Sequence, residues 1–292
     1  MPTLNTQLLT TIDKLISCKL NKDFHTITTY PIHGGDINQA FKLEGSKQQL
    51  FLKLQSGMPS DWFQQEFNGL TAILATKAIN APEPVIFGEY EDNQFLVLKY
   101  LNLITTGDWF QYGEQLAHLH KINNGKQHYG WPDDNFIGHT AQKNSWNNEW
   151  ANFFAQQRIG YQLEIATSNG YMLAAPNQQI IDVIYNQLAE HQPLASLVHG
   201  DLWKGNTGFT ETGPVLFDPA CYYADREVDL AMTELFERLP DAFYQGYQAV
   251  YPLEKGYQQR KSIYNLYHLI NHLNLFGRGY LGSVNSTIRQ LI

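Results

Sequence analysis

Cysteine is scarce in this sequence, and basic residues are outnumbered by acidic ones. Its 292 residues include two cysteines, Cys18 and Cys221, which lie far apart and in no spacing typical of metal ligands. A disulfide framework or a structural zinc site is therefore not expected. Lysine and arginine total 20 against 28 aspartates and glutamates, for a formal net charge of -8. This deficit of positive charge argues against a nucleic-acid partner, which requires a basic surface to neutralise phosphates.

Long apolar runs and a secretory leader are also missing. No stretch reaches the roughly 18 apolar residues needed to cross a bilayer. The N-terminus lacks a basic start followed by an apolar segment. We therefore expect a cytoplasmic protein without a membrane partner. The composition is 43% hydrophobic and 13% aromatic, which suffices for a large core, and the length suits two packed lobes.

The first hundred residues predict a small lobe rich in β-strands. Apolar residues at helical spacing predict a helix over residues 5–16. Five extended runs typical of strands follow, at residues 26–30, 39–43, 50–54, 85–88 and 95–100. Between the third and fourth runs, Ser60 is expected to cap a second helix.

Helical patterns dominate from about residue 103 onward. They cover residues 109–121, 146–165, 178–190 and 228 to the end, interrupted by two short strands near 197–198 and 215–217. The whole chain therefore predicts an α+β architecture with a β-rich lobe over 1–98, a hinge over 99–102 and a helical lobe over 103–292. We expect the active cleft between the two lobes, because pockets favour domain interfaces.

The strongest chemical signal is the segment HGDLWKGN at residues 199–206, followed by Phe-Asp-Pro at 217–219. Phosphoryl transfer needs a carboxylate beside the acceptor hydroxyl and oxygen ligands for magnesium. We assign Asp201 to the first role and Asn206 and Asp218 to the second, brought together by a hairpin. An ordinary turn with a strand-end cap is the alternative, and the joint spacing of all three residues favours the catalytic interpretation.

Lys53 stands in the apolar strand Phe-Leu-Lys-Leu, where alternation would place an apolar residue. A lysine on the inner face needs a counter-charge, since a buried unpaired ammonium is costly. Glu66 on the following helix is the expected partner, and kinase folds use such a pair to hold the phosphates of ATP. The alternative is an edge-strand lysine that points into water.

Two stretches of backbone are expected to contact the nucleotide. Gly34 and Gly35 occupy the turn between the first two strands, where glycine would let backbone amides approach phosphate. Taken alone, this pair is also typical of a simple hairpin turn. Lys99 and Leu101 follow the last strand of the small lobe, at the position of a hinge whose backbone groups would meet adenine.

Three further positions have competing interpretations. Trp203, beside the proposed catalytic carboxylate, could stack on a sugar-like substrate or belong to the core. Asp229 opens a helix, which favours a capping role, although its carboxylate could also bind the backbone of the catalytic loop. His118 and His120 are two residues apart without a third ligand, so a metal site is not expected there.

Over nearly its whole length the sequence resembles the fructosamine kinases, relatives of the aminoglycoside and choline kinases in the protein-kinase-like superfamily. The resemblance rests on the segments YGWPDDNFIG at 129–138, the tryptophan-rich helix from Ser145, HGDLWKGN at 199–206 and NHLNLFG at 271–277. The first and last of these are more specific than the residues of phosphoryl transfer alone. The sequence is thus similar to proteins with a two-lobed protein-kinase-like fold.

The resemblance implies ATP-dependent phosphorylation of a ketosamine at the sugar O3, which makes the adduct unstable and frees the amine. It implies ATP and Mg²⁺ as cofactors and the roles assigned above to Asp201, Asn206, Asp218, Lys53 and Glu66. Many relatives carry cysteine in the glycine-rich turn where this chain has Asp36, so a thiol switch through that turn is not implied.

Two other functions remain compatible with the sequence. The first is a kinase for another small hydroxyl compound, such as an aminoglycoside or choline. Sites for these cationic substrates need acidic clefts, which a net charge of -8 does not exclude. The second is a pseudokinase that binds nucleotide as a scaffold. It is disfavoured because such proteins usually lose a metal ligand or the catalytic acid, and here all three residues are present.

Overall fold

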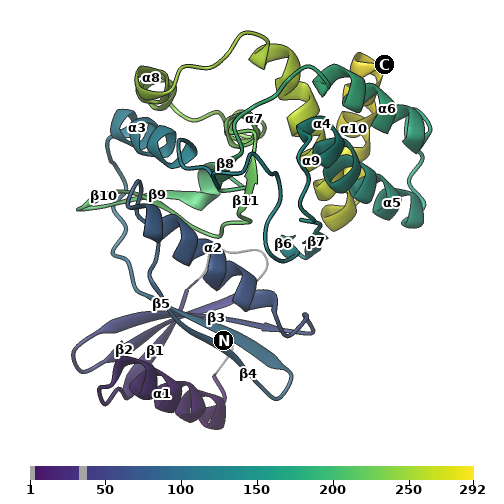
Figure 1. Ribbon diagram of the computed structural model, residues 1–292. Helices are drawn as coiled ribbons and strands as arrows, with labels where there is room; N and C mark the ends of the chain where they lie inside the picture. The colour runs from purple at the N-terminus through teal and green to yellow at the C-terminus, as the bar shows by residue number, and fades with distance from the viewer. Residues whose placement is uncertain (1–3, 33–37) are drawn as a thin grey trace. The chain divides into compact units, whose positions relative to one another are not determined.

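The computed structural model describes residues 4–32 and 38–292 (Figure 1). The chain divides into two compact units. The first comprises residues 1–107 and 208–218, and the second comprises residues 108–207 and 219–292. The sequence placed the end of the small lobe at residue 98 and a hinge at 99–102, and these functional boundaries stay a prediction.

An antiparallel sheet of five strands forms the first unit, in the order β1-β2-β3-β5-β4. The strands are β1 (Thr26–Ile32), β2 (Gln39–Gly45), β3 (Gln49–Ser56), β4 (Pro84–Tyr90) and β5 (Asn93–Lys99). The two helices are α1 (Thr6–Leu20) and α2 (Trp62–Thr76). All seven elements match those expected from the sequence, with the α1 helix extending one turn further.

The two helices lie on opposite faces of this sheet (Figure 1). Leu8, Ile12 and Ile16 of α1 pack in one apolar cluster with Leu52 and Leu54 of β3. Because side chains alternate along a strand, Lys53 faces the other side, toward α2. The α2 helix is capped differently from the prediction. Its N-cap residue is Asp61, not Ser60, and the Asp61 side chain makes no capping hydrogen bond.

The remaining part of the first unit is a hairpin of β9 (Thr207–Thr210) and β10 (Gly213–Leu216). Bridges from Asn80 to Val215 and from Ile104 to Phe209 attach it to the unit. The sequence predicted two short strands near 197–198 and 215–217, and the structure has strands at both places, β8 (Ser196–Val198) and β10. The segment between them also contains β9, whose four residues Thr-Gly-Phe-Thr are too few to show a clear strand pattern.

The second unit is mainly helical. Its helices are α3 (Trp109–His120), α4 (Trp150–Asn152), a π-helix (Phe153–Gly160), α5 (Tyr161–Ser168), α6 (Asn177–Leu188), α7 (Glu227–Met232), α8 (Asp241–Val250), α9 (Tyr257–Phe276) and α10 (Leu281–Leu291), with 3-10 turns at Lys204–Asn206 and Arg278–Tyr280. Two short antiparallel pairs accompany them: β6 (Asn135–Ile137) with β7 (Thr140–Gln142), and β8 (Ser196–Val198) with β11 (Tyr222–Ala224).

Two long helices expected from the sequence are interrupted. The helix predicted over 146–165 begins only at Trp150 and widens into the π-helix. The pattern from 228 onward is divided at Pro240, Gly256 and Gly277. Proline lacks an amide hydrogen and these glycines adopt positive φ, so each ends or begins a helix.

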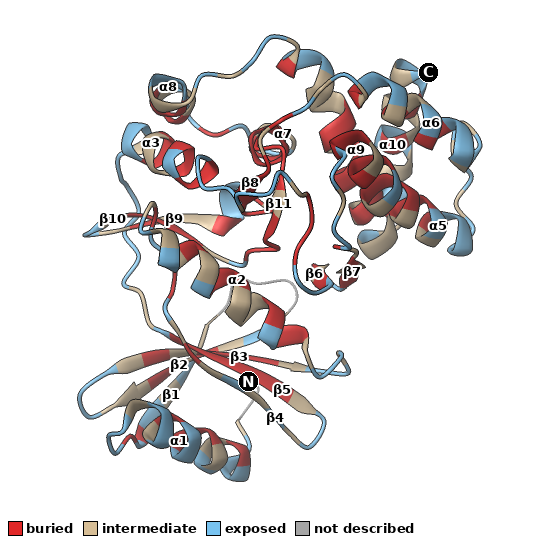
Figure 2. Cartoon of the chain, in the orientation of Figure 1, coloured by how far each residue is buried: buried red, intermediate tan, exposed pale blue. Residues whose placement is uncertain are grey.

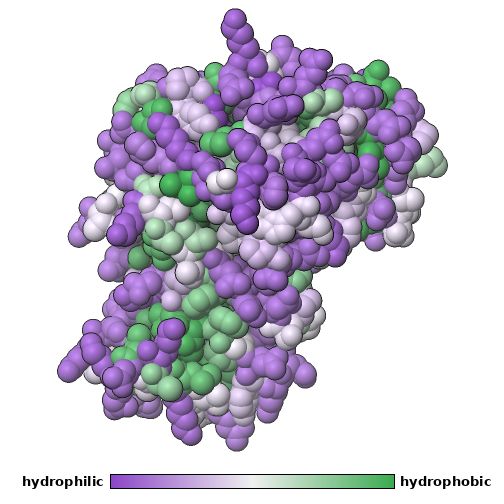
Figure 3. All heavy atoms as spheres, in the orientation of Figure 1, coloured by the Kyte–Doolittle hydropathy of each residue, from purple (hydrophilic) through white to green (hydrophobic). Residues whose placement is uncertain are grey.

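The centre of the second unit is buried, whereas the visible surface is largely polar. Strand β8 and helix α7 are buried throughout (Figure 2). On the face drawn in Figure 3 hydrophilic side chains predominate, with apolar patches between them. Within residues 4–32 and 38–292, every helix is too short or too polar to cross a bilayer.

Candidate active site

Lys53 lies at the middle of β3, between β2 and β5, and only 6% of it is exposed. Its Nζ donates hydrogen bonds to Glu66 Oε1 at 2.7 Å and to Asp218 Oδ1 at 2.5 Å. The ion pair with Glu66 expected from the sequence is therefore present, and the edge-strand alternative is wrong. All three residues belong to the first unit, and together we call them the lysine group.

The two carboxylates determine the ionisation of this lysine. Burial by itself lowers the pKa of Lys53, but the negative charges of Asp218 and Glu66 outweigh it and hold the pKa above its usual value. Burial raises the pKa of Glu66, against the opposing effect of the Lys53 charge. The lysine therefore stays cationic at neutral pH and can bind an anion such as phosphate.

Asp218 is the exposed member of the lysine group, with 53% of its side chain accessible. Its backbone adopts a left-handed conformation with φ of 51°, which is uncommon for a residue other than glycine and concentrates at functional sites. One carboxylate oxygen bonds Lys53. The carboxylate is thus both anchored and open to solvent, as a metal ligand must be.

The second unit holds residues 199–206, which follow the buried strand β8 and which we call the catalytic loop after their predicted role. The carboxylate of Asp229 accepts a hydrogen bond from the amide of His199 at 2.7 Å and from that of Gly200 at 2.8 Å. The sequence favoured a capping role for Asp229. Instead Asp225 bonds the first turn of α7, through the Glu227 amide at 3.0 Å, and Asp229 fixes the loop.

Asp229 is itself held by a buried histidine. His120 Nε2 lies 3.1 Å from its Oδ2, and His120 Nδ1 lies 2.8 Å from the hydroxyl of Tyr247. Burial alone would raise the pKa of Asp229, but the hydrogen bonds from His120 and the backbone keep that pKa below its ordinary value. Sequence reasoning left His120 without a role, because its partners lie more than 100 residues away.

Glycine is required at position 200. Its φ is +85°, and a Cβ atom there would stand 2.1 Å from the carbonyl oxygen of Ala220. Only glycine adopts this conformation without strain and leaves room for the neighbouring strand. The sharp bend sends the chain from buried β8 to Asp201, which is half-buried.

Asn206 completes the loop by bonding back to Asp201. Its Nδ2 donates to the carbonyl oxygen of Asp201 at 2.8 Å and approaches Asp201 Oδ2 at 3.3 Å. Because the amide nitrogen is occupied in this way, Asn206 Oδ1 is the atom left to act as a ligand. A neutral amide oxygen and a nearby carboxylate are hard donors that suit magnesium.

The other predicted site residues have mixed surroundings. Trp203 is 40% exposed, so the core alternative is wrong. The Lys99 side chain forms an ion pair with Glu83 at 2.5 Å, and its amide donates to the Glu83 carbonyl oxygen. Leu101 is half-buried. Gly34 and Gly35 lie outside the described residues, so their contact with phosphate stays a prediction.

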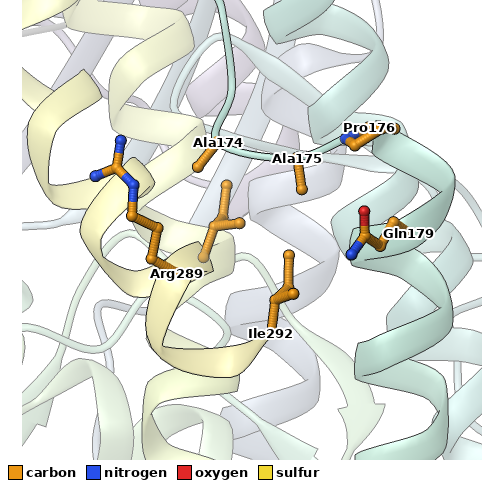
Figure 4. A pocket seen from close by; sticks show the side chains of 7 residues that line it. Ala174, Ala175, Pro176, Gln179, Arg289 and Ile292 are labelled. Carbon is orange, nitrogen blue, oxygen red and sulfur yellow. The ribbon is translucent and has the colours of Figure 1, made fainter.

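A cavity among the described residues lies elsewhere in the second unit. It measures about 250 Å³ and is lined from α6, α10 and the segment before α6 (Figure 4). Arg289 is the one charged side chain among its described lining residues, and none is a nucleophile or an acid. This cavity therefore carries no chemistry for phosphoryl transfer.

A five-stranded antiparallel unit, a mainly helical unit and an HGD loop held by a buried aspartate together define a kinase-like fold. Comparison with known proteins identifies the group more closely: the chain belongs to the fructosamine kinase family, whose model matches residues 8–292. It is therefore a small-molecule kinase, as the sequence predicted.

Individual relatives agree with this assignment. The chain is 42% identical to a probable ketoamine kinase of Synechocystis over 97% of this chain and 96% of the relative. It resembles the crystal structure of a putative fructosamine-3-kinase from Haemophilus somnus, with a TM-score of 0.91, 30% identity and 96% of each chain covered. An aminoglycoside phosphotransferase solved with ADP and hygromycin B shares the fold alone, with a TM-score of 0.64, 15% identity and coverage of 96% of this chain and 97% of that one.

Proposed function

We propose that this protein uses magnesium-ATP to phosphorylate ketosamines, the early adducts of a sugar on an amine, at the sugar O3. The phosphorylated adduct is unstable, so the reaction releases the amine and reverses glycation. The observation that carries the proposal is the presence of both a Lys53–Glu66–Asp218 group and an Asp201–Asn206 loop in a chain of the fructosamine kinase family. Named relatives are probable ketoamine kinases.

When bound, ATP would supply the phosphoryl group, and magnesium would neutralise the negative charge on the phosphate oxygens. In the proposed mechanism Lys53 binds the phosphates, while Glu66 keeps its ammonium oriented. The backbone at Lys99 and Leu101 and the turn at Gly34 and Gly35 are the proposed contacts for the rest of the nucleotide. An aminoglycoside phosphotransferase of the same fold binds ADP, which supports this use of the fold.

Asn206 and Asp218 are the proposed magnesium ligands. Asn206 directly precedes β9, and Asp218 comes two residues after β10. The hairpin therefore returns the chain from one proposed ligand to the other. An amide oxygen and an accessible carboxylate suit a small, hard cation that keeps several waters.

Asp201 is the proposed catalytic residue, which accepts the proton of the sugar hydroxyl as that oxygen attacks phosphorus. Asp229 holds the start of the loop that carries Asp201, because its carboxylate accepts hydrogen bonds from the amides of His199 and Gly200. Trp203, exposed two residues further on, is the proposed stacking surface for the sugar ring, because indole faces pack well against apolar C–H groups.

A substrate panel tests the proposal. The purified protein is incubated with magnesium-ATP and a ribulosamine, a fructosamine, an aminoglycoside or choline, and ADP release is followed. Ketosamines should be turned over, with phosphate on O3 by phosphorus NMR. Asp201→Asn should lower kcat by about 10²- to 10⁴-fold, the usual contribution of a positioned base. Efficient use of choline or an aminoglycoside without ketosamine turnover would reverse the assignment.

A further inference from the structure

Four aromatic side chains gather on the surface of the second unit. Phe236, His272, Phe276 and Tyr280, which we call the aromatic cluster, have ring centroids 4.6 to 6.4 Å apart, with His272 at the centre. Phe236 is 41% exposed and Phe276 is 54% exposed. Single exposed phenylalanines are ordinary, but a contiguous group of rings facing water marks a binding surface more often than a chance arrangement.

The cluster is built from two segments that the phosphoryl-transfer site does not use. His272 and Phe276 are one turn apart on α9, and Tyr280 follows in the 3-10 turn Arg278–Tyr280. These residues belong to or follow the segment NHLNLFG. Phe236 comes from the turn that follows α7, the helix that carries Asp229.

The cluster adjoins the catalytic loop within the same unit. Glu237, next to Phe236, forms an ion pair with Lys204, three residues after Asp201. Helix α7, which carries Asp229, packs against α9, which carries His272. The segments that carry the cluster therefore also contact the catalytic loop and the helix that holds it.

His272 presents an acceptor to such a molecule. Its Nδ1 lies 2.8 Å from the carbonyl oxygen of His268, and a carbonyl only accepts, so Nδ1 carries the proton. Burial lowers the pKa of His272, which keeps the ring neutral at pH 7. In the neutral ring Nε2 then has a free lone pair that can accept a hydrogen bond.

We propose that the aromatic cluster binds the ammonium group of the acceptor, so that the enzyme recognises the amine of its substrate as well as the sugar. This inference rests on the proposed function, because a ketosamine carries a secondary ammonium next to the sugar carbon chain. Three ring faces attract a cation through their quadrupoles. His272 Nε2 accepts one ammonium hydrogen, and Glu237, bound to Lys204 only through an exposed ion pair, supplies negative charge at the rim.

Kinetics with a matched substrate pair test this site. One substrate is the fructosamine of propylamine, and the other is its ether analogue, in which oxygen replaces the amine nitrogen. The wild-type enzyme should show a lower KM for the amine. Phe276→Leu keeps the apolar volume but removes a ring face, so it should raise the KM for the amine about 3- to 10-fold and leave kcat and the KM for the ether unchanged.

Two control variants separate recognition from folding. Phe276→Tyr keeps a ring face and should retain the wild-type KM for the amine. Phe110→Leu removes an exposed ring of the same unit from α3 and should change neither constant. The cluster would be overturned as the ammonium site if Phe276→Leu still phosphorylates the ketosamine and keeps the wild-type ratio of the KM for the ether to the KM for the amine.

A binding experiment distinguishes failure of this inference from failure of the proposed function. If the wild-type protein phosphorylates no ketosamine, N-methylpropylammonium is titrated into it and the ¹⁵N signal of His272 Nε2 is followed. A saturable shift that Phe276→Leu abolishes supports the cluster as an ammonium site of a kinase with another cationic acceptor. A signal that does not move overturns it.

Discussion

Lys53 Nζ and Asp218 Oδ1 lie 2.5 Å apart although their residues are 165 positions apart in the chain. The lysine comes from the centre of a five-stranded sheet and the aspartate from the end of the β9–β10 hairpin. Glu66 also binds this ammonium, which is therefore shared between a carboxylate that is 13% exposed and one that is 53% exposed. The group therefore keeps a cationic lysine next to a carboxylate that is open to solvent.

Lys53→Met should destabilise the protein by about 3 kcal/mol, because it leaves Glu66 buried without its counter-charge. The double variant Lys53→Met/Glu66→Gln should recover much of that loss, since the amide needs no cation. Urea unfolding measures both, and neither variant should regain kinase activity. Equal stability of the single and double variants would show that the pair is not coupled.

Asp218→Asn should raise the magnesium concentration needed for half-maximal activity by at least about tenfold, a loss typical even of groups that only support metal ligands. The amide keeps the shape of the side chain but removes the charge that attracts the cation. Asp241→Asn is the control, because it removes an exposed carboxylate that is paired with Arg238 instead. It should leave the dependence of activity on magnesium concentration unchanged. If both variants respond alike, the effect is not specific to the site.

Gly200→Ala should cost at least about 2 kcal/mol of unfolding free energy, because positive φ strain adds to overpacking against the carbonyl of Ala220. Gly170→Ala provides the comparison, since that glycine also has positive φ but no atom within 4 Å of the place that an alanine methyl group would take. It should lose only about 1 kcal/mol. Chemical denaturation of the two variants separates the cost of the contact with Ala220 from the cost of positive φ. An equal loss of unfolding free energy in both variants would show that this contact contributes nothing.

His268 should make the protein sensitive to mild acid. Burial, together with the nearby His272, lowers its native pKa to about 3, whereas the unfolded value is about 6.5. Below pH 6.5 the unfolded chain binds the proton first, so stability is complete above that pH and falls toward pH 3. The loss is up to about 1.4 kcal/mol per pH unit, or about 2 kcal/mol between pH 6.5 and 5.

His268→Phe removes this proton and should flatten the dependence of unfolding free energy on pH between 6.5 and 5. Urea unfolding at several pH values compares the variant with the wild-type protein, each relative to its own value at pH 7.5. Curves that stay parallel over this range would show that His268 takes up its proton equally in the folded and unfolded chain.

The first unit could be predicted almost completely from the sequence. Its five strands and two helices have clear periodicity and are bounded by glycine, proline and polar turns, so local preference and burial agree. The second unit was harder. Its π-helix and its short strands β6, β7 and β11 are only three to eight residues long, and β9 of the first unit, which the sequence also did not predict, has only four. Such segments take their conformation from the surfaces that surround them rather than from their own pattern.

The sequence by itself determined the chemical groups available to this protein: a lysine in an apolar strand, an HGD loop with an asparagine five residues after its aspartate, and a second aspartate after a strand. Only the tertiary structure decided the partners. It brings Asp218 into contact with Lys53 and Phe236 into contact with His272. It also directs the Asp229 carboxylate to the backbone of the catalytic loop, where it accepts a hydrogen bond from His199. Residue type and spacing act over a few positions, whereas these contacts depend on how distant segments pack together.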